Sequence, residues 1–304
     1  MAIRAHTVSR FYLSGFVAPE SEKMPDPFVW LGSLTTGEVK RRSPKNVSIV
    51  RGLYDGPGGF EESGISIETH LSRIEAAASS AIREFVATEP DGGVNPTPPI
   101  WRFLAWQAAR TPGWFELIQE WVNERDPNTT TQVIEPPPDG FDNIKDRIRT
   151  YCVEDPHSGQ RREVADVEEF RKLGWKWILR SDDQLELMHV QAWYFQVRHF
   201  PRLSWIRLNT PDDDWFITSD RAVTWLADGL TDTPPAALRH PTTQLVASLT
   251  RKTALVGRHE VKKLQVTPRE INRFIACTAS SWVAGPTRSV VEQAIQDRIA
   301  THGH

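Results

Sequence analysis

Residues 215–223 read Trp-Phe-Ile-Thr-Ser-Asp-Arg-Ala-Val. An apolar run that includes a β-branched residue ends there in two hydroxyls and a carboxylate, and a second apolar run follows. This order is typical of a strand, a turn that presents polar groups, and another strand. We therefore expect the polar residues that the chain sets within apolar segments elsewhere to converge on the turn formed by Ser219 and Asp220.

The other elements follow from the period of the apolar residues. Alternating or β-branched runs predict further strands at 28–31, 46–50, 203–208, 243–249 and 254–256. Helical spacing predicts helices at 66–87, from Pro98 onward, at 164–173, at 182–199, from Pro268 onward and at 287–299. We interpret the basic segment 40–45 as a turn. The predicted fold class is α+β, predominantly helical, with a small, mostly antiparallel sheet in the C-terminal half.

Length and composition predict one large globular domain. The chain has 304 residues, of which 39% are hydrophobic and 25% are charged, and this is enough for a sizeable core. A polar, Pro-rich excursion at 126–142 divides it into halves of about 1–125 and 143–304. We expect the halves to intermesh in a single domain that spans residues 1–304.

Charge, cysteine usage and hydropathy argue against several classes of protein. The net charge of −3 and the pI near 6.3 give no overall basic field, so a nucleic-acid contact would need a local patch such as 40–45. Cys152 and Cys277 stand in neither CxxC nor Cys/His spacing, which argues against a zinc ribbon. Without an apolar leader or a run of about 18 apolar residues, we expect a cytoplasmic protein that does not contact a membrane.

Several polar side chains stand at helical spacing beside apolar or aromatic residues. His6 and Arg10 are four positions apart and would share a helix face, either as an anion site or as a solvated helix start. Glu75 lies close to the apolar stripe of the helix at 66–87, where a carboxylate is either ion-paired or a site residue. Gln107 and Arg110 are adjacent on the next helix, and Glu75 is the expected partner of that arginine.

Five short motifs follow one another along nearly the whole chain. They are His6-x-x-x-Arg10-x-Tyr12-Leu13-x-x-Phe16, Ser43-Pro44-Lys45-Asn46-Val47, the pair Glu68 and Glu75, Gln107-x-x-Arg110-Thr111-Pro112, and Phe216-Ile217-Thr218-Ser219-Asp220-x-x-Val223. In this order they resemble the bacterial family catalogued as domain of unknown function 4238 (DUF4238). The chain departs from that family at two loops, because Ser9 stands where a proline is common and Arg221-Ala222 stands where Asn-Pro is common.

The family name carries no established activity, so the resemblance implies positions and not a reaction. It marks two sets of candidates. The catalytic candidates are His6, Glu75, Ser219 and Asp220. The substrate-binding candidates are Arg10, Tyr12, Lys45, Gln107 and Arg110.

These groups favour a hydrolase that acts on a phosphodiester or a nucleotide, in the manner of a nuclease. Arg10, Lys45 and Arg110 would neutralise developing charge, and His6, Glu75 and Asp220 would act as acid, base or metal ligand. Asp220 and Glu75 are the expected ligands if Mg²⁺ or Mn²⁺ takes part, because these ions prefer oxygen donors. A Ser219–His6–Asp220 acyl-transfer triad is disfavoured, since no GxSxG elbow surrounds the serine.

Two other hypotheses stay open, so the sequence does not decide whether the protein is an enzyme. The same pocket would suit a binding module or sensor that recognises an anionic small molecule or a nucleic-acid end without turnover. Alternatively, Arg110, Glu75 and Asp220 form a buried ion-pair network that joins the two halves, and the functional residues lie elsewhere.

Overall fold

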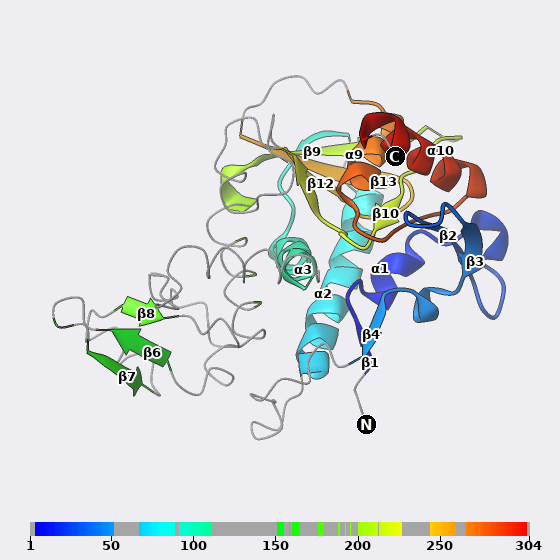
Figure 1. Cartoon of the computed structure of the whole chain (residues 1–304). Coiled ribbons are helices and arrows are strands. Elements are labelled where there is room, and N and C mark those ends of the chain that lie inside the picture. The colour runs from blue at the N-terminus through cyan, green and yellow to red at the C-terminus, as the bar shows by residue number, and fades with distance from the viewer. Residues whose placement is uncertain are drawn as a thin grey trace.

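A computed structural model of the chain describes a set of ranges that leaves out several internal segments. The described residues are 4–51, 67–88, 91–110, 151–154, 158, 160–164, 176–178, 188, 192, 195, 200–211, 213–226, 244–259 and 266–302. Figure 1 draws the others as a thin grey trace. The excursion at 126–142 lies outside the described residues, as do most of the helices predicted at 164–173 and 182–199.

Two antiparallel sheets form the centre of the fold (Figure 1). The four-stranded sheet has the order β10 (Thr218–Ser219), β14 (Trp282–Gly285), β2 (Val29–Ser33), β3 (Val39–Arg42). The five-stranded sheet has the order β11 (Thr224–Leu226), β12 (Gln244–Ser248), β13 (Thr253–Arg258), β9 (Ser204–Asn209), β5 (Gly92–Val94).

The prediction of a predominantly helical chain with a small sheet in the C-terminal half is wrong. Strands β2, β3 and β5 come from the N-terminal half and pair with strands of the C-terminal half or with each other. The pairing partners lie far away in sequence, as in the register of Leu31 with Ala284, so no local period reveals them. The segment that begins at Gly92 also has low intrinsic strand preference, and it becomes a strand by pairing with β9.

Two smaller antiparallel sheets complete the strands of the described part. One pairs β1 (Arg4–His6) with β4 (Ile49–Arg51). The other has the order β7 (Arg161–Val164), β6 (Tyr151–Glu154), β8 (Lys176–Ile178).

The helices begin and end at residues that local rules favour. The described helices are α1 (Arg10–Ser14), α2 (Ile67–Thr88), α3 (Pro98–Ala109), α9 (Pro268–Thr278) and α10 (Arg288–His302). Prolines occupy the first turn of α3 and α9, and Thr267 and Glu270 form a capping box at the start of α9. None of the helices in the described part of the chain is long and apolar enough to cross a membrane.

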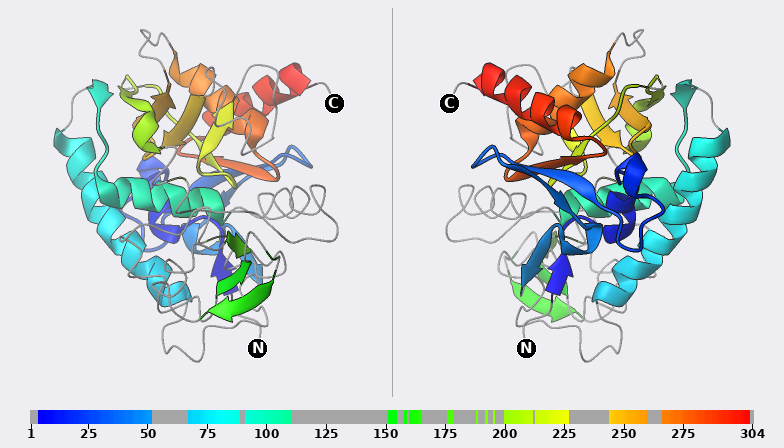
Figure 2. Two further views of the ribbon diagram at one scale, coloured as in Figure 1. Left: turned by 90° about the vertical axis from the view of Figure 1, so that its left-hand side faces the viewer. Right: turned by 90° about the vertical axis from the view of Figure 1, so that its right-hand side faces the viewer.

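The sheets separate two hydrophobic clusters, because alternate residues of each strand point to opposite faces. On β2, Val29 belongs to the cluster that also contains residues of α1, α2 and α3. A Cβ at Gly32 would meet Ile295 of α10, so this position faces the second cluster, to which α9 and α10 contribute. Figure 2 shows α9 and α10 together on the upper side of the sheets, with α3 below them. The core therefore has helices on both faces of its sheets.

Residues 215–223 lie at the junction of the two sheets. β10 is the last strand of the four-stranded sheet, and β11, the next strand along the chain, is the last strand of the five-stranded sheet. Residues 220–223 carry the chain from one sheet to the other. The predicted order of strand, polar turn and strand is confirmed, although β10 contains only two residues.

Candidate functional site

The hydroxyl of Ser219 is occupied by the backbone of its own turn. Its Oγ accepts a hydrogen bond from the N–H of Arg221 at 3.1 Å and donates to the carbonyl of Arg221 at 2.9 Å. The side chain is fully buried. Serine commonly makes such local bonds in turns, and here they shape the passage from β10 to β11.

The carboxylate of Asp220 holds the loop that precedes β14. Its Oδ1 accepts from the N–H of Ser280 at 3.0 Å and its Oδ2 from the N–H of Ser281 at 2.6 Å. Arg221 adds a bond from its Nε to the Oγ of Ser280 at 3.1 Å. Burial raises the pKa of Asp220, while the two backbone N–H groups act in the opposite direction. Both oxygens thus join the sheet junction to the end of α9.

Tyr12 ties α1 to the same junction from the other face of the sheets. Its hydroxyl donates to the carbonyl of Ser248 and also lies 3.4 Å from the carbonyl of Ala222. It accepts from Oγ1 of Thr218 at 3.3 Å. Burial raises the pKa of this phenol well above its ordinary value, so the hydroxyl stays protonated and acts as a structural hydrogen-bonding group.

Glu75, Gln107 and Arg110 form a cluster between α2 and α3. The guanidinium of Arg110 donates from Nη2 to Oε1 of Glu75 at 2.9 Å and from Nε to Oε1 of Gln107. Arg110 is 2% exposed, whereas the side chain of Glu75 is 25% exposed. The predicted pairing of Glu75 with Arg110 is confirmed. A buried cation is thus neutralised by a carboxylate that still reaches water.

His6, Arg10 and Lys45 gather where α1 contacts the short helix η2 (Pro44–Asn46). We call these three residues the cationic corner. Asp26 lies among them and accepts from Oγ of Ser43 at 2.8 Å and from Nζ of Lys45 at 3.0 Å. These bonds, with the charges of Lys45 and Arg10, lower the pKa of Asp26. The ring of His6 places Nδ1 3.2 Å from the carbonyl oxygen of Val47, directly after η2.

A family model described as "Protein of unknown function (DUF4238)" matches residues 4–289. The chain belongs to the DUF4238 family. The match includes every candidate residue of this DUF4238 chain, but the family description assigns none of them an activity. Comparisons with curated proteins and with solved structures find no match.

The candidates of this DUF4238 member therefore fall into three groups. One is the sheet junction with Tyr12, Ser219 and Asp220, another is the Glu75–Gln107–Arg110 cluster, and the third is the cationic corner. Asp220 and Glu75 are bonded to different partners, the N–H of Ser280 and the guanidinium of Arg110. The convergence of the three groups on a single turn stays a prediction.

Metal binding by Asp220 and Glu75 also stays a prediction for this DUF4238 member. Within the described ranges, no three or more His, Cys, Asp or Glu side chains are grouped so as to hold one metal ion. The two predicted ligands are carboxylates, which suit Mg²⁺ or Mn²⁺. Their oxygens in this structure accept hydrogen bonds from backbone N–H groups and from Arg110.

The interpretation of the basic segment 40–45 as a turn is wrong for its first half. Residues up to Arg42 belong to β3, and Trp30 of β2 is directly opposite Arg41. The guanidinium of Arg41 lies 4.7 Å from the ring centroid of Phe28 and 5.0 Å from that of Trp30. Runs of Lys and Arg have low strand preference, and the cross-strand aromatic rings overcome it here. The alternation of Val39 with Arg41 was the available signal.

Other polar residues that the sequence did not single out serve the backbone of this DUF4238 fold. Arg207 donates to the carbonyls of Phe85 and Val86, both at 2.8 Å, at the C-terminal end of α2, where a cation is favoured by the helix dipole. Asn272 of α9 accepts from the N–H of Ile217 at 3.0 Å. Both are contacts between segments distant in sequence, which no spacing rule predicts.

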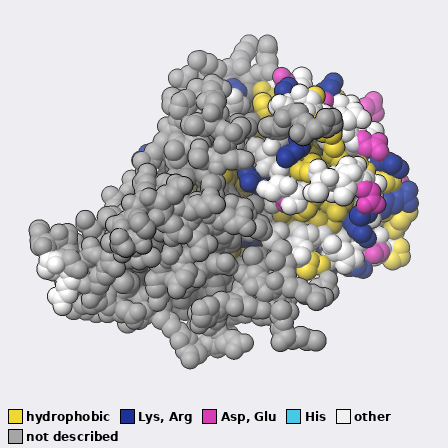
Figure 3. Space-filling model, in the orientation of Figure 1, with side chains coloured by type: hydrophobic (Ala, Val, Ile, Leu, Met, Phe, Trp, Pro, Cys, Tyr) yellow, Lys and Arg dark blue, Asp and Glu magenta, His cyan; other side chains and the backbone are white. Residues whose placement is uncertain are grey.

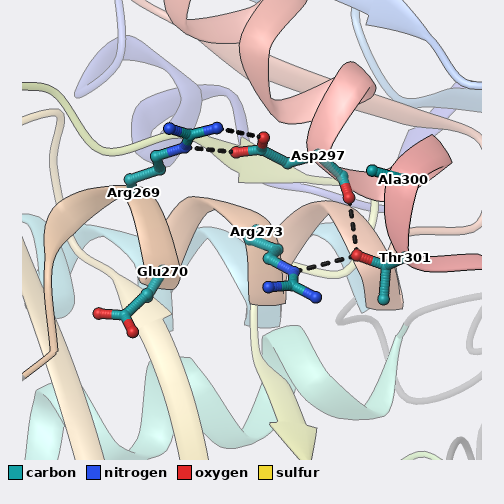
Figure 4. Close-up of a pocket in the computed structure, with 6 residues that line it drawn as sticks. All are labelled: Arg269, Glu270, Arg273, Asp297, Ala300 and Thr301. Carbon is teal, nitrogen blue, oxygen red and sulfur yellow. Dashed lines mark hydrogen bonds and ion pairs between the residues drawn. The ribbon is translucent and has the colours of Figure 1, made fainter.

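A shallow hollow of about 220 Å³ lies between α9 and α10, and Arg269, Arg273, Asp297 and Thr301 of its lining are joined by hydrogen bonds (Figure 4). Arg269 makes two bonds to Asp297, at 3.0 and 2.8 Å, and Arg273 donates to Thr301 at 3.0 Å. The lining charges, two arginines against Glu270 and Asp297, cancel. We therefore interpret this hollow as part of the joint between the two helices.

Proposed function

We propose that this protein binds a phosphate-bearing ligand, a nucleotide or a nucleic-acid end, at the cationic corner. The observation that carries this proposal is the ion pair of Lys45 with Asp26 at 3.0 Å, beside α1, where the charge of Arg10 also lowers the pKa of Asp26. The two cations come from α1 and η2, which are separated in sequence and contact each other in the fold. Such convergence requires tertiary structure, so it is more than a basic run in the sequence.

The charge of the corner favours an anion. Asp26 offers one negative charge to two positive ones, and its own position is exposed. The guanidinium of Arg10, also exposed, has no hydrogen-bond or ion-pair partner within the part of the chain that the structure describes. Guanidinium groups bind phosphate oxygens through two parallel N–H donors. A phosphate would thus complete the hydrogen bonding of Arg10 and compete with Asp26 for Lys45.

The Glu75–Arg110 pair joins α2 to α3, the helix against which α1 packs. Phe11, next to Arg10, packs against Phe103 of α3 with ring centroids 4.9 Å apart, and Arg110 follows at the end of that helix. Breaking the ion pair would leave a buried charge, which is costly. We therefore assign Arg110 to holding α2 and α3 in place, and not to first contact with the ligand.

Hydrolysis of a phosphodiester is the enzymatic form of the proposal, and the position of His6 favours it. Its Nδ1 lies against the Val47 carbonyl, and a neutral imidazole that donates there carries its lone pair on Nε2. A ring in that state can accept a proton from water and return it to a leaving oxygen. Glu75 and Asp220 remain the predicted acid, base or metal ligands for such a reaction.

Binding is tested by titration calorimetry with a dinucleotide that does or does not carry a 5′-phosphate. We expect the phosphate to strengthen binding to wild type and the double variant Arg10→Ala, Lys45→Ala to weaken it by on the order of tenfold or more, as loss of charge-assisted bonds predicts. The control is Arg83→Ala, because Arg83 is exposed and, among the described residues, bonds only within α2, to Ser79 and Ser80. Equal affinity with and without the 5′-phosphate would contradict the proposal.

Turnover is tested separately, on the same ligand, by chromatographic detection of products with and without Mg²⁺ or Mn²⁺. The enzymatic form predicts product formation that His6→Ala abolishes, while binding through Arg10 and Lys45 remains measurable. Tight binding with no product under either condition would support a binding module or sensor and contradict the hydrolase.

A further inference from the structure

The positive charge of the cationic corner continues along the edge of a sheet. β3 is the last strand of the four-stranded sheet, and it carries Lys40, Arg41 and Arg42. Lys40 is paired with Glu38 at 2.8 Å. Arg42 is exposed, and the described residues offer its guanidinium no hydrogen bond or ion pair. Figure 3 shows Lys and Arg side chains gathered over β2 and β3 on the right-hand side of the molecule.

Arg41 is held by aromatic rings and not by acceptors. Its guanidinium lies over Phe28 and Trp30, and Arg288 of α10 lies 5.9 Å from the same Trp30 ring. Trp30 is itself half-buried and packs against the core cluster of α9 and α10. Stacking uses the face of a guanidinium and leaves its N–H edge available. Arg41 is thus an oriented cation whose N–H groups donate no hydrogen bond to the described residues.

The two unpaired arginines of β3 point to opposite faces of the strand, because they are neighbours in sequence. Arg41 shares the face of Trp30, toward α10, and Arg42 shares the face of Val29, toward α1 and the cationic corner. Side chains on opposite faces of a strand end on the order of 10 Å apart. One phosphate group cannot reach both arginines, whereas a thin, flexible polyanion that turns around the edge can.

We infer that the ligand is a single-stranded nucleic acid that lies across the edge of β3. This inference rests on the proposed function, since the cationic corner would hold the terminal phosphate. Arg42 and then Arg41 would contact successive backbone phosphates on the two faces of the strand. We call Arg10, Lys45, Arg42 and Arg41 together the cationic track. Because the chain has an overall charge of −3, the cationic track must supply the attraction, and binding must weaken strongly with salt.

The test measures fluorescence anisotropy of 5′-phosphorylated oligothymidylates of two, four and eight nucleotides, at roughly 50 and 200 mM salt. Four phosphate contacts, from Arg10, Arg41, Arg42 and Lys45, predict a loss of affinity of roughly 50-fold across that salt range for the longer strands. Arg41→Ala with Arg42→Ala leaves two contacts and predicts a loss of roughly 7-fold. Arg83→Ala removes an exposed arginine of α2 that bonds to Ser79 and Ser80, and this variant should retain the wild-type dependence.

Arg41→Lys isolates the role of the aromatic stack. It keeps the charge but not the planar group that lies on Phe28 and Trp30. We expect weaker binding of the eight-nucleotide strand and unchanged binding of the two-nucleotide one. Wild-type affinity of Arg41→Lys for the longer strand would overturn the proposed role of the stack.

The outcomes separate this inference from the proposed function. Binding that depends on Arg10 and Lys45 but not on strand length overturns the track and leaves the corner as a nucleotide site. A second outcome is binding that depends on strand length and is weakened by Arg41→Ala but not by Arg10→Ala. That result would support the phosphate contacts along β3 and contradict the phosphate site at the cationic corner. Equal affinity for polyglutamate of matched charge would show a surface for acidic proteins and overturn the assignment to nucleic acid.

Discussion

Replacing Asp220 by alanine separates a structural role from a catalytic one. The carboxylate accepts two backbone N–H groups, from Ser280 at 3.0 Å and Ser281 at 2.6 Å, and is 8% exposed. In Asp220→Ala both N–H groups lose their acceptor, and the loop between α9 and β14 loses its attachment to the sheet junction. We therefore expect the variant to be destabilised.

The magnitude follows from the number of bonds and the solvent access of the donors. A hydrogen bond to a charged group stabilises by about 1.5–3 kcal/mol, so two bonds give about 3–6 kcal/mol. Two effects reduce this sum: Ser280 and Ser281 are exposed, so water can replace the lost acceptor, and the buried carboxylate no longer needs to be desolvated. A net loss of about 2–4 kcal/mol remains. Asp220→Asn keeps one acceptor oxygen and should lose about half as much.

The assay is urea unfolding followed by circular dichroism, on wild type and both variants, at several pH values. Burial raises the pKa of Asp220, so above about pH 4 the unfolded carboxyl releases its proton before the folded one does. The free energy of unfolding of wild type should therefore fall relative to Asp220→Asn as pH rises from about 4 through the folded pKa. Above that pKa the difference should be constant.

Either of two results would contradict this reasoning. If Asp220→Ala unfolds at the same urea concentration as wild type, the two N–H bonds do not hold the junction. If the same variant also abolished hydrolysis of a phosphodiester with binding intact, Asp220 would belong to a reaction and not to the turn. Wild type whose free energy of unfolding does not fall with rising pH relative to Asp220→Asn would contradict the assigned effect of burial.

Three further changes are expected to alter stability by amounts that the same unfolding assay measures. Glu75→Ala leaves the buried guanidinium of Arg110 without its carboxylate partner and should cost about 3–5 kcal/mol; a loss below about 1 kcal/mol would show that the pair is not structural. Tyr12→Phe removes the hydroxyl at the junction and should cost about 1–3 kcal/mol, whereas an unchanged midpoint would contradict its role there. Gly32→Ala places a Cβ 2.6 Å from Cδ1 of Ile295 and should cost about 1–3 kcal/mol, and a neutral result would show that α10 shifts freely.

Local signals in the sequence predicted the local elements. The helix at 66–87 occurs as Ile67–Thr88, and the helix that opens at Pro98 has prolines in its first turn. These elements are specified by the spacing of their own residues and by capping. Sheet membership was not predictable in the same way, because β2 pairs with β14 at the other end of the chain. A strand such as β5, with two glycines, is specified by its partner and not by its own side chains.

In the candidate site, too, contacts that follow from local spacing were predictable and contacts that depend on tertiary structure were not. The pairing of Glu75 with Arg110 was predictable, because both stand on apolar helix faces where a charge needs a partner. Asp26 gave no signal, since an aspartate in a Pro-containing loop is ordinary. Its meeting with Lys45 depends on how η2 folds back on α1. The stack of Arg41 on Trp30 depends on the register of β2 with β3, which a basic run in the sequence conceals.

The polar turn at 219–220 and the cationic corner carry the same kind of residues for different physical reasons. A chain that leaves one sheet edge and enters another leaves backbone N–H and C=O groups without strand partners, and side chains can pair them. Ser219 and Asp220 do this pairing with every oxygen they have. Arg10, Arg41 and Arg42 satisfy no such need within the described residues, because their guanidinium groups make no hydrogen bond or ion pair there. Polar groups that are hydrogen-bonded to the backbone stabilise the fold. Cationic groups without such a partner among the described residues are the better candidates for binding a ligand.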